Sequence, residues 1–173
     1  MSKKLVVYFS HKGENYSKGK IVNLKKGNTE IATEIISSII ETDIFEIVAD
    51  KKYPIKYDDC IEIAKKELRE NSRPKLKDDI DIKEYDTIFV GYPNWWGTMP
   101  MPVWTFLEEK DFTNKKVLPF CTHEGSGLGK SESYIKKLTG GAEVLKGLAI
   151  NGSEVNNSEK QIKKWLEDSL KWQ

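Results

Sequence analysis

The 173-residue sequence has few features of a secreted, membrane-spanning or metal-binding protein. Its two cysteines, Cys60 and Cys121, have no Cys-x-x-Cys spacing and no nearby cysteine or histidine at metal-ligand spacing, so we expect reduced thiols in a packed core. No apolar run approaches the roughly 20 residues that cross a bilayer. The amino terminus also lacks the apolar segment of a signal peptide. These absences predict a cytoplasmic protein that does not enter the membrane.

An excess of charge of one sign is absent as well. Lysine and arginine total 28, aspartate and glutamate total 27, and the formal net charge is +1. A balanced chain has no general affinity for nucleic acid and does not strongly steer a charged partner. The length suits one domain over residues 1–173, large enough to bury a core without disulfides or a structural metal.

Short apolar runs alternate with longer amphipathic stretches along the whole chain. This alternation predicts βαβ units, and therefore a three-layer, doubly wound α/β sandwich around a five-stranded parallel sheet. Right-handed connections favour the strand order 2-1-3-4-5. We expect strands over residues 5–9, 43–48, 87–91, 116–121 and, as one strand in two parts, 142–145 with 148–150. We expect helices from about residue 29 and over residues 57–71, 103–109, 131–138 and 158–170.

The loop after the first strand begins at Ser10 and ends in Gly27-Asn28-Thr29 at the start of a helix. Free backbone N–H groups and the positive end of a helix dipole form an anion site, which suits a phosphate. Alternatively, Asn28 or Thr29 only caps the helix. The position of Ser10, directly at the strand end, favours the phosphate.

The loop after the third strand contains two adjacent tryptophans, Trp95 and Trp96. Neighbours in an extended segment point in opposite directions, so at least one ring should be exposed or lie against a ligand. A planar cofactor would gain by stacking on such a ring. The alternative is that both rings pack beneath a loop or at a subunit contact.

The loop after the fourth strand, residues 122–129, is rich in glycine. Glycine lets backbone amides and carbonyls approach a flat ligand closely. Because ligands of open parallel sheets bind beyond the carboxyl ends of the strands, the three loops together predict one binding site.

Three motifs in these loops resemble those of the flavodoxin family. They are Tyr-Phe-Ser at the first strand end, Gly-Asn-Thr at the helix start and Pro-Asn-Trp-Trp after the third strand, and the similarity covers nearly the whole chain. It implies a flavodoxin-like fold and FMN as cofactor. The phosphate contacts that it implies are Ser10, Asn28 and Thr29. The ring contacts that it implies are Pro93, Asn94, Trp95, Trp96, Gly97, Thr122, His123, Gly125, Ser126 and Gly127.

The sequence departs from this family in two ways. An insert from His11 to Lys26 separates Ser10 from the Gly-Asn-Thr motif, and its position is open. The balanced charge differs from the acidic character of electron-carrying flavodoxins, which disfavours a shuttle that docks on basic partners.

The resemblance implies electron transfer to a redox partner protein or a small-molecule acceptor. An FMN-dependent reductase that uses NAD(P)H to reduce quinones or similar acceptors is an alternative, so whether the chain is an enzyme stays open. His11, His123 and Glu124 are then available to protonate an acceptor, although a plain hydrogen-bonding role fits each histidine. A flavin-free regulatory or binding module is a third alternative, disfavoured because no acidic cluster follows the first or third strand. We assign no catalytic residue and no metal ligand.

Overall fold

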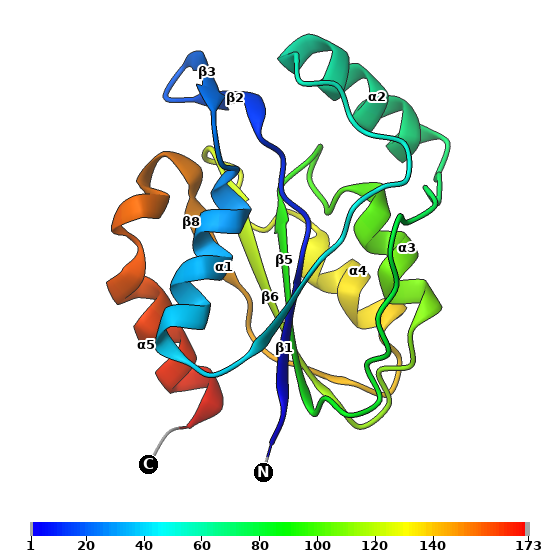
Figure 1. The fold of residues 1–173 in the computed structure, drawn as a ribbon, viewed down its shortest axis with the longest axis vertical. Helices are drawn as coiled ribbons and strands as arrows, with labels where there is room; N and C mark the ends of the chain where they lie inside the picture. The colour runs from blue at the N-terminus through cyan, green and yellow to red at the C-terminus, as the bar shows by residue number, and fades with distance from the viewer. Residues whose placement is uncertain (1, 172–173) are drawn as a thin grey trace.

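The computed structural model describes residues 2–171, which form a mostly parallel sheet between two layers of helices (Figure 1). The sheet has the order β4-β1-β5-β6-β7, and β8 also pairs with β6. Its strands are β1 (Lys4–Tyr8), β4 (Asp43–Glu46), β5 (Thr87–Pro93), β6 (Lys116–His123), β7 (Glu143–Val144) and β8 (Leu148–Asn151). Its helices are α1 (Asn28–Ile39), α2 (Tyr57–Arg69), α3 (Met101–Glu109), α4 (Ser131–Leu138) and α5 (Glu159–Leu170), with a short 3₁₀ helix η1 (Gly152–Asn157) before α5. The predicted fold class and strand order are confirmed.

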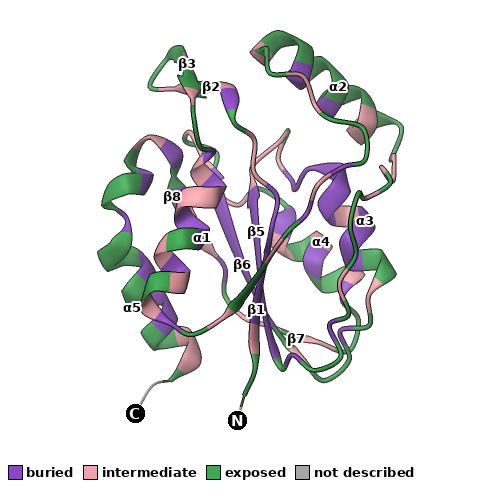
Figure 2. Ribbon diagram, viewed as in Figure 1, coloured by how far each residue is buried: buried purple, intermediate pink, exposed green. Residues whose placement is uncertain are grey.

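The central strands β1, β5 and β6 carry the core, and Figure 2 shows them buried along nearly their whole length. Their side chains alternate between the two faces of the sheet, as the period of two in a strand requires. Leu5 and Val7 pack in the cluster that includes α3 and α4, whereas Val6 packs with α1 and α5. Continuous apolar runs form these strands because both faces of the sheet are covered.

The fifth predicted strand is divided. β7 pairs with the start of β6 through Val117↔Val144, and β8 pairs with its end through Phe120↔Leu148. Pro119 lies between the two pairings and has no N–H to donate to a ladder. Gly147 lies between β7 and β8, and its backbone N–H donates to the Glu132 carboxylate at 2.9 Å rather than to a strand. The expectation of five strands is therefore corrected to six.

The insert forms an antiparallel hairpin, β2 (Gly13–Ser17) and β3 (Lys20–Leu24), which pattern reading leaves unassigned. Its turn residues Lys18 and Gly19 both have positive φ, 49° and 81°, as a type I′ turn requires. Figure 1 shows this hairpin and α2 above the carboxyl ends of β1 and β5, the hairpin on the left and α2 on the right. Within residues 2–171, no helix combines the length and apolar character needed to span a membrane.

Candidate functional site

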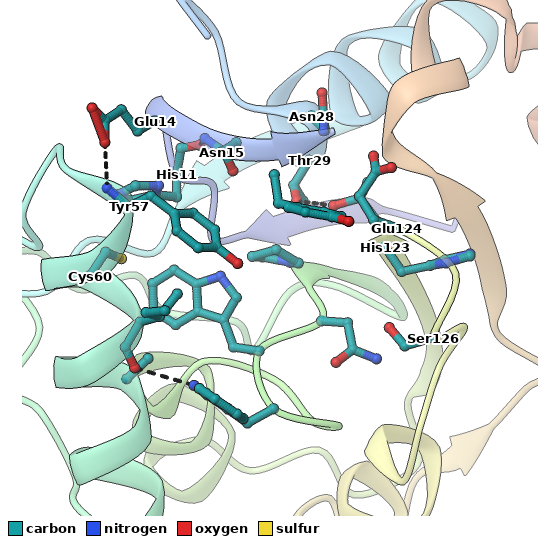
Figure 3. Close-up of a pocket in the computed structure, with 18 of the residues that line it drawn as sticks. His11, Glu14, Asn15, Asn28, Thr29, Tyr57, Cys60, His123, Glu124 and Ser126 are labelled. Carbon is teal, nitrogen blue, oxygen red and sulfur yellow. Dashed lines mark hydrogen bonds between the residues drawn. The ribbon is translucent and has the colours of Figure 1, made fainter. Parts of the chain in front are cut away.

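A cavity of about 420 Å³ opens at the carboxyl edge of the sheet (Figure 3). The start of α1 and the loops after β1, β5 and β6 contribute to it, as the sequence predicts, and so do α2 and the hairpin. Its lining residues are His11, Glu14, Asn15, Tyr16, Asn28, Thr29, Tyr57, Cys60, Ile61, Ala64, Pro93, Asn94, Trp95, Trp96, Gly97, Thr122, His123, Glu124 and Ser126. Of the predicted site residues, Ser10, Gly125 and Gly127 lie beside the lining rather than in it.

The start of α1 lies at one end of this cavity and offers free donors. A Cβ on Gly27 would lie 2.1 Å from Ser10 Oγ, so the chain returns after the hairpin to touch the residue from which the insert began. Ser10 Oγ accepts the backbone N–H of Glu30 at 3.1 Å. Within residues 2–171, the N–H groups of Asn28 and Thr29 have no hydrogen-bond partner. These two groups lie at the positive end of the helix dipole and can bind an anion.

Neither Asn28 nor Thr29 caps α1 with its side chain. The N-cap residue is Gly27, and no side-chain capping bond is present there. The Thr29 hydroxyl is buried and shares a hydrogen bond of 2.9 Å with the Thr122 hydroxyl. Capping is therefore wrong as an account of these two side chains. The Thr29 hydroxyl instead joins the start of α1 to the end of β6.

Asn94 holds the two ring-side loops together. Its backbone N–H donates to the Thr122 carbonyl at 2.8 Å. Its side-chain Nδ2 donates to the Gly127 carbonyl at 2.8 Å, and its Oδ1 accepts the Gly97 N–H at 2.9 Å. Both polar ends of the amide are thus used within the protein. Asn94 acts as a positioning residue for both loops.

The two tryptophans have different environments, which confirms the expectation that at least one ring is exposed. Trp95 is half-buried, and its ring lies edge-on to Phe9 and Tyr53 with centroids 5.1 Å away in each case. Trp96 is 49% exposed, and its Nε1 donates to the Ile61 carbonyl of α2 at 3.3 Å. Trp96 has φ 57° and Gly97 has φ 88°, the positive values that a type I′ turn needs.

Both histidines near the cavity are engaged in structural hydrogen bonds. His11 Nε2 donates to the Pro54 carbonyl at 2.9 Å. His123 Nδ1 accepts the Gly125 N–H at 2.8 Å and shapes the loop after β6. Burial lowers the pKa of His123, although nearby Glu124 opposes the shift, so the neutral ring is favoured at pH 7. The hydrogen-bonding role expected of the histidines is present in both.

Residues of the hairpin and α2 complete the cavity, and pattern reading does not find them. Glu14 fastens the two elements, because its Oε2 accepts the Tyr57 N–H at 2.8 Å. The rings of Tyr16 and Tyr57 then lie 6.5 Å apart between centroids. Cys60 is buried nearby, and burial raises the pKa of its thiol to about 12. In the sequence, the hairpin is indicated only by Lys18-Gly19, a pair that suits a two-residue turn between Tyr16 and the apolar residues of β3.

The chain is an α/β protein with a cavity at the point where the strand order reverses, which is where open parallel sheets bind ligands. A family model described as Flavodoxin matches residues 3–169, and the chain therefore belongs to the flavodoxin family. The predicted resemblance is confirmed. No curated protein matches the chain.

Three solved structures illustrate the similarity. A candidate flavoprotein from Bacteroides eggerthii is 27% identical, with 98% of this chain and 99% of that chain covered and a TM-score of 0.79. A candidate flavoprotein from Bacteroides uniformis is 29% identical, with 96% and 98% covered and a TM-score of 0.75. A flavoprotein in complex with FMN from Lactobacillus acidophilus is 24% identical, with 91% and 98% covered and a TM-score of 0.64.

Proposed function

We propose that the chain binds FMN in the cavity at the carboxyl edge and transfers electrons through it. The observation that carries this proposal is one cavity with free helix N–H groups at one end and the Trp95–Trp96 turn beside it. Membership of the flavodoxin family and the FMN complex of the Lactobacillus acidophilus flavoprotein support it. The volume of about 420 Å³ lies within the range of small-molecule and cofactor sites.

The residues present fit a phosphate at one end and a flat ring at the other. The N–H groups of Asn28 and Thr29 would donate to the phosphate, and the Ser10 hydroxyl retains a proton to donate beside them. The ring would lie between the loop of residues 93–97 and the loop of residues 122–127. Bound FMN would supply the capacity to accept and release electrons, while the protein orients it and limits the access of water.

Asn94 and Thr122 prepare the site before a ligand arrives. Their hydrogen bonds fix the distance between the loops after β5 and β6 and the start of α1. A preformed site loses less entropy on binding than a mobile one. The hairpin and α2 restrict access to the opening because Glu14 joins them.

Titration of the apoprotein with FMN tests the proposal. We expect quenching of flavin fluorescence with one-to-one stoichiometry, because an aromatic ring lies beside the site. At 100 times the Kd, binding adds about 2.7 kcal/mol of stability. For a chain of this length, that gain raises Tm by about 5–10 °C. AMP at the same concentration provides a control for the phosphate alone. Unchanged fluorescence and unchanged Tm with excess FMN would exclude the proposal.

Reductase activity is a second candidate, favoured by Tyr16 and Tyr57. These rings come from the hairpin and α2, outside the three loops predicted to hold the flavin, and they line the same cavity. They would offer an aromatic surface to a small planar acceptor such as a quinone. Steady-state oxidation of NAD(P)H by the FMN-loaded protein distinguishes the two candidates. A reductase oxidises NAD(P)H when quinone is the only other addition, whereas a shuttle does so only when a partner reductase is also present.

A further inference from the structure

We propose that Glu124 is a specificity-determining residue that weakens the preference of this site for phosphorylated over unphosphorylated flavins. The inference rests on the proposed function, because it concerns flavin bound in the same cavity. It assigns to Glu124 a different role from the protonation of an acceptor that the sequence suggests.

Glu124 lies at the phosphate end of the cavity rather than at the ring end. It follows β6 directly, and it lines the cavity together with Asn28 and Thr29 (Figure 3). A Cβ built on Gly152 would lie 3.0 Å from Glu124 Oε1 and 2.5 Å from Asn28 Nδ2. Both polar groups therefore converge on the same glycine beside the start of α1.

The Glu124 carboxylate is poorly compensated. Its Oε1 is buried and, among residues 2–171, has no hydrogen-bond partner. Its Oε2 accepts only the backbone N–H of Lys18, at a long 3.4 Å. The Lys18 ammonium group instead pairs with Glu154 at 3.3 Å. In the described part of the chain, Glu124 forms no salt bridge, so its charge is not neutralised by a neighbouring cation.

A phosphate at the start of α1 would lie beside this negative charge. A phosphate monoester carries about −1.5 to −2 charges at pH 7, and the partly buried cavity screens like charges less than water does. Riboflavin has a hydroxyl in place of the phosphate and escapes this repulsion. Glu124 therefore opposes the attraction of the helix N–H groups for FMN and leaves riboflavin binding unaffected.

The test compares FMN and riboflavin binding in Glu124→Gln and the wild type, by quenching of flavin fluorescence at pH 7.5 and fixed salt. Glutamine keeps the shape of the side chain and removes its charge. We expect Glu124→Gln to bind FMN about tenfold more tightly, because repulsion by one carboxylate across a partly solvated cavity is of that order. Riboflavin affinity should change less than about twofold. Glu143→Gln, an exposed residue at the far end of the sheet, is the control for net charge.

Each outcome decides the inference. An unchanged ratio of FMN to riboflavin affinity in Glu124→Gln would overturn it, as would weaker binding of both flavins, which would assign Glu124 to the shared part of the ligand. Equal gains in Glu124→Gln and Glu143→Gln would attribute the effect to net charge and also overturn it. If neither flavin binds the wild type, the proposed function itself fails. The Tm of each apoprotein verifies that the variants fold.

Discussion

Replacement of Gly27 by alanine tests whether the chain must return to Ser10 after the insert. Gly27 has φ −65°, which alanine adopts freely, so the effect is one of space alone. The new methyl group would lie 2.1 Å from Ser10 Oγ and 2.9 Å from the His11 carbonyl oxygen. Ser10 can rotate away, but it then loses its bond to the Glu30 N–H. The His11 carbonyl is backbone and can move only with the loop.

The expected cost follows from these two contacts. Loss of the hydrogen bond from the Glu30 N–H to Ser10 Oγ costs about 1 kcal/mol. Displacement of tightly packed backbone costs roughly 1–2 kcal/mol more. Gly27→Ala should therefore lower the free energy of unfolding by about 2–3 kcal/mol and Tm by about 5–10 °C. It should also weaken FMN binding, because the N–H groups of Asn28 and Thr29 belong to the same turn.

Urea unfolding followed by circular dichroism measures this cost, with Gly140→Ala as the matched control. A Cβ on Gly140 has no atom within 4 Å, so that variant should change stability by less than about 0.5 kcal/mol. Ser10→Ala removes the oxygen that the new methyl group would meet. The double variant should therefore be no less stable than Gly27→Ala alone. Equal stability of Gly27→Ala and Gly140→Ala, or additive costs in the double variant, would refute the steric argument.

Three further predictions concern the ring-side loops. Asn94→Leu should cost about 2 kcal/mol in urea unfolding, because one N–H and one carbonyl lose their partner; a smaller cost than for Ser10→Ala would contradict its positioning role. Trp95→Leu should cost about 2 kcal/mol and Trp96→Leu about 0.5 kcal/mol, since only Trp95 is packed among aromatic rings; a reversed order would show that the exposures are misassigned. The pKa of His123 is lowered in the folded state, so the unfolded chain takes up the proton first and stability falls as pH drops below about 6.5. His123→Asn should reduce this fall in urea midpoints measured between pH 7.5 and 5.5, and an identical pH profile for both proteins would contradict the assignment.

The hairpin explains how Ser10 and the Gly-Asn-Thr motif, which the insert separates in sequence, come together in the structure. Ser10 and Gly27 lie in contact although 16 residues separate them, because β2 and β3 pair in register and return the chain to its starting point. A two-residue turn of positive φ makes this return possible. The hairpin also contributes Glu14, Asn15 and Tyr16 to the lining of the cavity.

Local patterns in the sequence determined the alternation of strands and helices, their order and the three loops that meet at one edge. Buried parallel strands require continuous apolar runs, and amphipathic helices require apolar residues about every 3.6 positions. Both patterns can be recognised in the sequence without knowledge of which segments pack together. Thr29 and Trp95 could be placed near one cavity because loops at the carboxyl ends of parallel strands must converge, whereas Asn94 was implied by the resemblance to the flavodoxin family.

Only the tertiary structure decided which groups those loops present. Two bonds between distant residues hold α2 in place. The Tyr57 N–H donates to Glu14, 43 residues away, and Trp96 Nε1 donates to the Ile61 carbonyl, 35 residues away. The division of the last strand depends on its pairing with either side of Pro119. The place of Glu124 beside Asn28 depends on the packing of η1 against both. Contacts between distant segments leave no periodic trace in a sequence, because each of them depends on where the folded chain brings its partner.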